Sequence, residues 1–285
     1  MHHSLTVAAL STSLSSMFPC ISQVSTLSAS FADDLANAAG AGFPAIELWL
    51  TKLEQHLASA SLVETASRIA DSGLAIAAAS YQGGLLAETG ERRAAHLDHF
   101  KRRLDLCQRF VIPTMVIAEF PQSLDRMVLG GALKQLAEAA RWAAGFGVKL
   151  ALEFRGNESF CNCLDTAIAI VEQIGEPNLG LCLDAFHYYK GPSKPDDLER
   201  LTVANLFHMQ VCDVAGVPRE QMTDSDRVMP GDGDFRLEPI IGRLRAIGYA
   251  GAVSLELMNP TLWQIDAAQV LAAGKQTLDR LLANR

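Results

Sequence analysis

The sequence predicts an α/β protein that folds as a (β/α)8 barrel, in one domain over residues 1–285. Short strand-like apolar runs alternate with helix-like segments along the whole chain, and eight such strands can be counted. No linker divides them, and a barrel of this kind needs about 250 residues. The alternative, an open doubly wound sheet, would carry a glycine-rich phosphate loop after an early strand. Neither GxGxxG nor a P-loop motif is present.

The expected strands are short runs of apolar residues that stop at polar or turn-forming residues. The second reads PAIELWL and the sixth LGLCLD, which is typical of strands buried on both faces. The strands cover residues 5–11, 44–50, 74–80, 112–118, 148–154, 179–184, 206–212 and 252–257. The expected helices, several of which stop near a glycine as a C-terminal cap, cover residues 31–41, 62–72, a long segment ending at 109, 124–146, a segment from about 164, 237–247 and 265–282.

Composition excludes several classes of function. The net charge is −8 and the pI about 5.4, which argues against a nucleic-acid groove or an anionic membrane surface as partner. The six cysteines form no CxxC pair, so we interpret them as reduced thiols of a cytoplasmic protein. Cys161 and Cys163 lack the second pair that a thiolate metal site would need.

The segment from Leu5 to Met17 is apolar and rich in small residues, somewhat like the core of a signal peptide. No Lys or Arg precedes Lys52, so the positive region of a signal peptide is missing. We therefore expect the first barrel strand here. No run reaches the roughly 18 apolar residues of a membrane span, so no membrane association is expected.

Polar side chains stand at the ends of four successive strands. Glu153 ends the fifth strand and Asp184 the sixth, while Gln210 lies on the seventh and Glu256 on the eighth. In a barrel the carboxyl ends of these strands surround one mouth, where such folds place their chemistry. One strand-end acid alone is more often a helix cap or a salt-bridge partner. Three carboxylates together repel one another unless a cation neutralises them, so the set predicts one divalent ion, Mn²⁺ or Mg²⁺.

The motifs LALEF, GLCLDAFH, QVCD, RVMPGDGDF and VSLELMNP resemble the sugar phosphate isomerase/epimerase superfamily, the xylose-isomerase-like TIM barrels. The resemblance is specific over residues 148–260 and general before them. It implies a divalent ion held by a Glu, an Asp, a His and a Glu on strands five to eight. Carried over, Glu153, Asp184 and Glu256 match three of these ligands.

The third ligand position departs from the family pattern, which places a His three residues before an acid on strand seven. Here the acid is Asp213 and the position is Gln210, so we expect Gln210 as ligand and His208 as a histidine of the barrel core. The 3-dehydroshikimate dehydratase branch looks similar in using Gln at this place. Its last strand also reads like SLELMN.

The resemblance also implies residues that contact substrate. His187 would act as an acid or base, as would Glu153 and Glu256; the alternative for His187 is a packing role beside two tyrosines. An Arg of the loop after strand seven would bind substrate, and Arg219 is preferred over Arg227, although the choice stays open. Three further residues are candidate pocket walls, with packing or ion pairing as their alternatives: Glu47, Trp49 and Tyr81.

Together these features predict a metal-dependent isomerase or epimerase of a sugar or polyol-derived ketone, working through an enediolate. A dehydratase of a cyclic keto acid is the alternative, because it shares the first proton abstraction. A non-catalytic metabolite-binding barrel and a DNA repair endonuclease of the same fold are weaker readings; the latter needs more His ligands and a basic groove. Barrels of this family commonly associate, so a homo-oligomer is compatible with the sequence.

Overall fold

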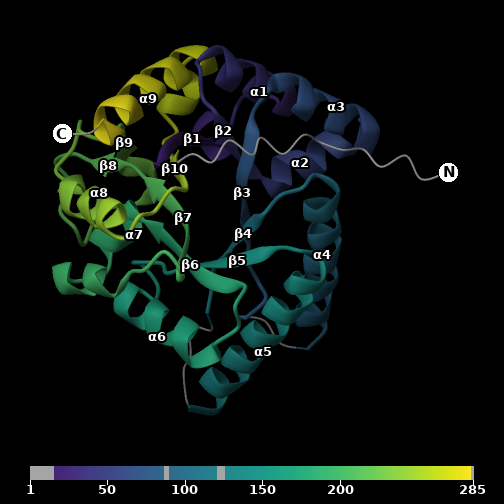
Figure 1. The fold of residues 1–285 in the computed structure, drawn as a ribbon, viewed down its shortest axis with the longest axis vertical. Helices are drawn as coiled ribbons and strands as arrows, with labels where there is room; N and C mark the ends of the chain where they lie inside the picture. Colours follow the sequence, from purple (N-terminus) through teal and green to yellow (C-terminus); the bar gives the residue numbers. More distant parts are fainter. Residues whose placement is uncertain (1–15, 87–89, 121–125, 284–285) are drawn as a thin grey trace.

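The computed structural model describes residues 16–86, 90–120 and 126–283. Eight parallel strands close into a barrel in the order β1-β10-β7-β6-β5-β4-β3-β2, which confirms the (β/α)8 prediction (Figure 1). The barrel strands are β1 (Phe18–Ser22), β2 (Ala45–Trp49), β3 (Ala75–Gln82), β4 (Thr114–Ile117), β5 (Lys149–Glu153), β6 (Leu179–Asp184), β7 (Leu206–Val211) and β10 (Ala252–Leu255). After β7, the two-residue strands β8 (Asp213–Val214) and β9 (Arg227–Val228) form a small antiparallel pair over the barrel mouth.

Helices surround the barrel, and the first and last of them pack together where the ring closes (Figure 1). The α-helices are α1 (Phe31–Gly40), α2 (Leu50–Leu57), α3 (Leu62–Ser72), α4 (Gly90–Arg109), α5 (Arg126–Gly145), α6 (Leu164–Ile174), α7 (Ala185–Lys190), α8 (Leu237–Ala246) and α9 (Ala267–Leu282). The short 3-10 helices are η1 (Gln23–Thr26), η2 (Pro195–Arg200), η3 (Asp224–Asp226) and η4 (Leu262–Gln264). Local sequence sets the boundaries of α3: Ser61 and Glu64 form a reciprocal capping box, and Gly73 ends the helix at φ +71°.

One strand prediction was wrong. Residues 5–11 lie outside the described part of the chain, and the first barrel strand is β1, Phe18–Ser22. Its sequence, FPCIS, contains a proline, which usually argues against a strand within a sheet. Two short helices, α2 and α7, were not predicted from the sequence; each begins directly at the end of a barrel strand.

Side chains of the barrel strands alternate between two layers. Ile21, Ile46 and Val253 join the main core between strands and helices. Their neighbours Cys20 and Ala45 belong to a separate cluster of small side chains in the barrel interior. The next inward-facing residues on these strands, two positions later, are polar: Ser22 and Glu47. The barrel interior therefore changes from small and apolar to polar and charged toward the carboxyl ends of the strands.

A bulge in β7 changes this alternation at one point. Leu206 pairs with Leu181 and His208 pairs with Cys182, so Phe207 has no partner on β6. Phe207 packs against the interior cluster around Cys182, and the side chain of His208 also lies inside the barrel. The bulge thus lets Phe207 fill the lower barrel, meaning the interior at the amino ends of the strands. The later residues of β7, such as His208 and Gln210, keep their inward positions toward the mouth.

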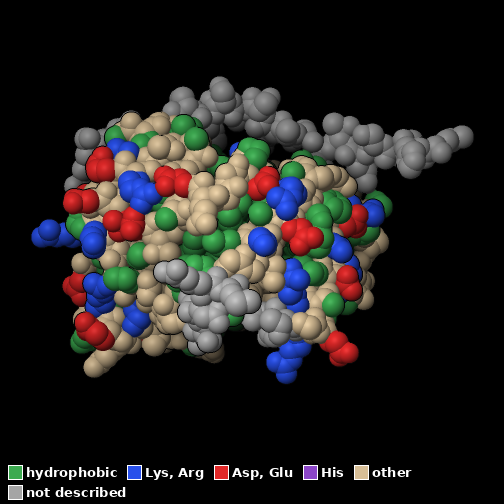
Figure 2. Space-filling view, turned by 90° about the horizontal axis from the view of Figure 1, so that it is seen from below, with side chains coloured by type: hydrophobic (Ala, Val, Ile, Leu, Met, Phe, Trp, Pro, Cys, Tyr) green, Lys and Arg blue, Asp and Glu red, His purple; other side chains and the backbone are tan. Residues whose placement is uncertain are grey.

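The surface in Figure 2 mixes acidic and basic side chains along both sides of the face, with apolar side chains between them. Among the described helices, none combines the length and the apolar character needed to cross a membrane.

Candidate active site

A cavity of about 100 Å³ lies at the barrel mouth, at the carboxyl ends of the strands. Most of the predicted site residues meet there, together with charged side chains from the loops above. The lining residues are Val24, Trp49, Ser80, Tyr81, Val116, Glu153, Arg155, His187, Gln210, Asp224, Arg227, Glu256 and Met258. The position of this cavity is the one at which (β/α)8 enzymes carry out their chemistry.

Arg227, the first residue of β9, inserts its guanidinium among the strand-end acids. Nη2 lies 2.7 Å from Asp184 Oδ2, and Nη1 lies 3.0 Å from Glu256 Oε2. Asp224 closes the cluster from above, with its Oδ1 2.7 Å from Nη2. The guanidinium also stacks 4.5 Å from the ring centroid of Phe186. Burial opposes its charge, but Asp184 and the other acids raise the pKa of Arg227, so it stays a cation.

Glu153 ends β5 inside this cluster and differs from the other acids. Among the described residues, no hydrogen-bond donor reaches its carboxylate; the nearest polar partner is His187 Nε2, 3.8 Å from Oε1. Burial raises the pKa of Glu153 to about 8, with Arg155 opposing the rise and Asp184 adding to it. Glu153 is therefore a carboxyl group that can exchange a proton near neutral pH.

His187 lies on α7, the helix that Asp184 begins by accepting the backbone N–H of Phe186 at 2.9 Å. Burial lowers the pKa of His187 to about 3, so the imidazole is neutral. Its Nδ1 accepts the N–H of Gly156 at 3.4 Å, which assigns the ring proton to Nε2. Nε2 lies 3.8 Å from both Glu153 and Asp184, so this N–H faces the acids.

Gln210 forms part of the cavity wall, with its amide nitrogen between two carboxylates. Nε2 donates to Glu47 Oε1 at 2.9 Å and to Glu256 Oε1 at 2.8 Å. The amide oxygen accepts from the thiol of Cys182 at 3.1 Å. Burial raises the pKa of Glu256 far above its usual range, with Arg227 opposing the rise.

The donor set fits a divalent cation. Oxygen or nitrogen atoms of Glu153, Asp184 and His187 lie within 4.8 Å of one another, and all three side chains are buried. Glu256 is not part of this group of three, and Arg227 links it to Asp184 by ion pairs to both. Gln210 presents its nitrogen to Glu256, so its oxygen could serve as ligand only after the amide has turned.

Two predicted substrate residues lie away from the cavity surface. Arg219 donates to the carbonyls of Lys190 and Gly191 in the outer loop, so Arg227 is the arginine that the structure brings to the mouth. Glu47 is fully buried and is not a lining residue of the cavity. Its carboxylate bonds to His208 and Gln210. Trp49 and Tyr81 do line the cavity, as the sequence suggested.

Two charged lining residues were not singled out from the sequence, and a further acid, Glu119, contacts the cavity wall at Tyr81. Arg155 and Asp224 line the cavity and lie 3.9 Å apart. Glu119 follows β4 with φ +81° and accepts from the Tyr81 hydroxyl at 3.4 Å and from the Gly84 N–H at 2.7 Å. A positive φ in a non-glycine residue beside a cavity is a recognised mark of a functional position. Arg155 had a signal in the sequence, since it follows Glu153 by two residues at a strand end.

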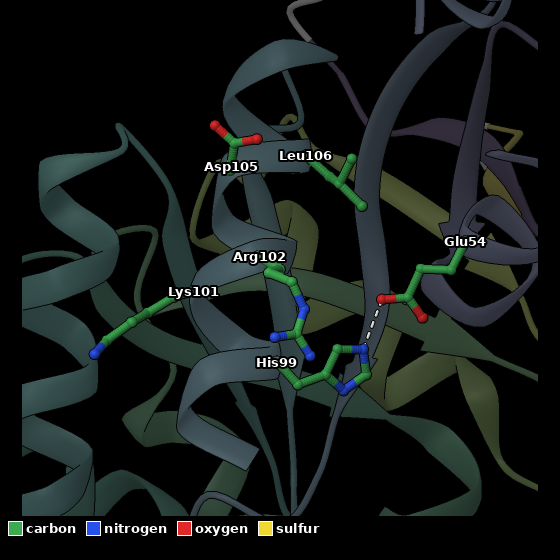
Figure 3. A pocket seen from close by; sticks show the side chains of 6 residues that line it. All are labelled: Glu54, His99, Lys101, Arg102, Asp105 and Leu106. Carbon is green, nitrogen blue, oxygen red and sulfur yellow. Dashed lines mark hydrogen bonds and ion pairs between the residues drawn. The ribbon is translucent and has the colours of Figure 1, made fainter. Parts of the chain in front are cut away.

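A second hollow, of about 670 Å³, lies on the outside of the barrel over α2 and α4 (Figure 3). Its side chains include Glu54, His99 and Lys101. Glu54 accepts from His99 at 2.7 Å and from Arg103 at 2.8 Å, and Lys101 lies over the Trp142 ring. These charges are engaged in pairs that tie α4 to its neighbours, and none of the predicted site residues lies there.

Comparison with known proteins agrees with this architecture. The family model described as xylose isomerase-like TIM barrel matches residues 35–281. Inosose isomerase of Halalkalibacterium halodurans is 33% identical over 187 residues, which span 64% of this chain and 66% of that isomerase. The 3-dehydroshikimate dehydratase of Pseudomonas putida is 24% identical over 258 residues, 89% of this chain and 40% of the dehydratase.

Among solved structures, the crystal structure of an IolI protein with a bound zinc atom superposes with a TM-score of 0.88 at 25% identity. The superposition covers 94% of this chain and 98% of the other. The family model spans the barrel from α1 to α9, including every strand-end acid described above. The chain therefore belongs to the xylose isomerase-like TIM barrel family.

Proposed function

We propose that this protein is a divalent-metal-dependent isomerase or epimerase of a polyol-derived ketone, a cyclic inosose being the first candidate. The observation that carries the proposal is the arrangement of Glu153 and His187. A buried carboxyl group lies 3.8 Å from the Nε2 of a buried imidazole, whose N–H faces the same cavity. The similarity to inosose isomerases supports the substrate class.

The proposed ion is held by Glu153, Asp184 and Glu256, while Gln210 bonds to Glu256 through its amide nitrogen. When bound, it would supply positive charge next to the substrate carbonyl and so stabilise the negative oxygen that forms there. Mn²⁺ and Mg²⁺ suit such a carboxylate set, and the zinc in the similar IolI structure adds Zn²⁺ to the metals to be tested.

The protein's own groups carry the proton. A carboxylate of the pair Glu153 and Glu256 takes a proton from the carbon next to the carbonyl, which leaves an enediolate. The same group or its partner returns a proton to the former carbonyl carbon. The hydroxyl hydrogen passes to the former carbonyl oxygen, and the carbonyl moves by one position. His187 donates its Nε2 hydrogen toward a substrate oxygen and orients it. Return of the proton to the opposite face of the first carbon would give an epimer instead.

The remaining walls suit a polyhydroxylated ring. Trp49 offers an apolar face for C–H groups, whereas Tyr81 and Ser80 offer hydroxyl groups. Arg155 and Asp224 approach from the loops and can bond to substrate hydroxyl groups at the outer rim.

A dehydratase of the 3-dehydroshikimate type is the second candidate. Gln210 favours it, since the dehydratase branch resembles this chain at that position. The similarity to the P. putida dehydratase also supports it. Both reactions begin with the same proton abstraction. They differ in whether a hydroxyl group then leaves from the next carbon.

The test uses protein loaded in turn with Mn²⁺, Mg²⁺ and Zn²⁺. Inososes and keto-sugars are incubated in D₂O, and deuterium at the carbon next to the carbonyl is followed by NMR. In parallel, 3-dehydroshikimate is followed by the absorbance of an aromatic product. Deuterium uptake with a moved or inverted centre supports the isomerase or epimerase, and an aromatic product supports the dehydratase.

Glu153→Gln is the control, because it keeps the size of the side chain and removes its ability to take a proton. It should abolish exchange in either case. If the parent exchanges no deuterium and forms no aromatic product with any of the three metals, a metabolite-binding barrel without catalysis becomes the better explanation.

A further inference from the structure

Below the cavity floor, a buried carboxylate is surrounded by hydrogen-bond donors from three strands. Glu47 Oε2 lies 2.9 Å from His208 Nε2 and accepts from the Ser254 hydroxyl at 2.6 Å. Oε1 accepts from Gln210 Nε2 at 2.9 Å. Ser80 adds a further hydrogen bond from β3. None of these five side chains is more than 5% exposed.

This arrangement leaves Glu47 no free face for a substrate. It also fixes the direction of the Gln210 amide, because an ionised carboxylate only accepts hydrogen bonds and so requires the nitrogen of the amide. The second hydrogen of the same nitrogen goes to Glu256 Oε1 at 2.8 Å. A glutamine suits this position, because its one amide nitrogen carries two hydrogens for the two carboxylates and does not ionise.

Glu256 is consequently held from two sides. Gln210 donates to Oε1 from below, and Arg227 donates to Oε2 from above at 3.0 Å. Residues that bond to a metal ligand and fix its orientation commonly change metal affinity 10- to 100-fold when they are replaced. Such residues act on the ion without touching it.

We propose that Glu47, anchored by His208 and Ser254, is a positioning residue that aligns Gln210 and, through it, Glu256 for the metal ion. The inference rests on the proposed function, because that function makes Glu256 a ligand. In this proposal Glu47 does not contact substrate as the sequence had suggested, but supports the metal site from below. It also assigns a role to His208, as the partner that keeps Glu47 in place.

The principal test measures Mn²⁺ affinity of metal-free protein by isothermal titration calorimetry, for the parent, Glu47→Gln and Glu153→Gln. Asp34→Asn is the matched control, because Asp34 is an equally buried acid that bonds Lys52 and Thr26 outside the site. We expect Glu47→Gln to weaken Mn²⁺ binding roughly 10- to 100-fold. Asp34→Asn should bind like the parent, although both variants lose a buried charge.

A second readout follows the Gln210 side chain directly. In protein labelled with ¹⁵N-glutamine, the Gln210 amide signal is assigned by its loss in Gln210→Ala. Both of its hydrogens should exchange slowly in the parent, because both bond to buried carboxylates. In Glu47→Gln one hydrogen should shift and exchange faster. A residue with a purely structural role would lower thermal stability without this change.

The outcomes separate the two proposals. If Glu153→Gln binds Mn²⁺ as the parent does, the proposed metal site is wrong and this inference falls with it. If Glu153→Gln loses binding while Glu47→Gln keeps parental affinity, the site stands and the positioning role is wrong. Should Glu47→Gln fail to fold, Ser254→Ala removes one anchor with little change in volume. It should then weaken Mn²⁺ binding several-fold, and unchanged affinity would overturn the inference.

Discussion

The guanidinium of Arg227 donates to the carboxylate of Asp184 over 2.7 Å, and both side chains are almost completely buried. The pair joins a loop residue to the end of β6 and places a fixed positive charge among the acids of the site. Arg227 therefore partly compensates the charge of the strand-end carboxylates before any ion binds.

Replacing Arg227 by Met should destabilise the metal-free protein, because Asp184 and Glu256 would remain buried without a cation. Removal of one partner of a buried ion pair typically costs about 3–5 kcal/mol. Urea unfolding followed by circular dichroism would measure the loss. Addition of Mn²⁺ should recover part of it, because an ion at the acids restores the missing charge. Equal stability of the variant and the parent without metal would contradict the role assigned to Arg227.

The buried pair of Asp34 and Lys52 should produce a measurable pH dependence of stability. Burial raises the pKa of Asp34 from 3.8 to about 6, with Lys52 opposing the rise. Between these values the folded protein holds the proton more tightly than the unfolded chain. Asp34 therefore adds about 3 kcal/mol to the free energy of unfolding below about pH 4, and this contribution is lost as the pH rises through about 6.

This prediction is tested with the urea unfolding free energy at intervals from pH 3.5 to 7. Asp34→Asn has no carboxyl group to titrate, so its profile should lack the decline between pH 4 and 6. If the unfolding free energy of both proteins falls equally between pH 4 and 6, a group other than Asp34 causes the fall.

Tyr81 should respond to a change at Glu119, although the two residues come from different strands. Burial raises the pKa of Tyr81, and the carboxylate of Glu119, which accepts its hydroxyl, raises it further. Glu119→Gln should therefore lower the pH at which Tyr81 ionises. The measurement is the ultraviolet titration of tyrosinate, with Tyr81→Phe used to identify the transition. An unchanged transition would show that the two side chains do not interact in solution.

Of the six cysteines, only Cys163 should react rapidly with a thiol reagent in the native protein. It is partly exposed, whereas the other five are buried. Burial raises the pKa of Cys107 to about 12 and raises those of four others as well, which suppresses the reactive thiolate. Titration with Ellman's reagent should give one fast thiol in native protein and six in denaturant. Cys163→Ser should abolish the fast phase, and a second fast thiol would show that the barrel opens locally.

The sequence was most informative where a strand's end coincides with a change from apolar to charged residues. Glu153 and Asp184 end β5 and β6 as predicted, because buried parallel strands read as apolar runs and stop at the first acid. The same logic failed for β1. There a proline lies within the strand, and an apolar segment earlier in the chain looked more like a strand.

Contacts made across the barrel were beyond the reach of sequence patterns. Glu47 lies in the middle of β2, and only the closed barrel shows that its carboxylate bonds to Gln210 and His208, more than 150 positions later. The choice between Arg219 and Arg227 depended on the path of a loop. That path is set by the short β8–β9 pair, whose two-residue strands carry no detectable periodicity.

The unpaired residue of β7 has a consequence for how this chain can change length. Leu206 and His208 already occupy the outward and inward positions of an uninterrupted ladder, so removing Phe207 would restore regular pairing with β6 and leave Gln210 in place. The deletion would empty the lower barrel without shifting the mouth. The bulge thus separates the residue that fills the amino-terminal end of the barrel from the residues that form the mouth.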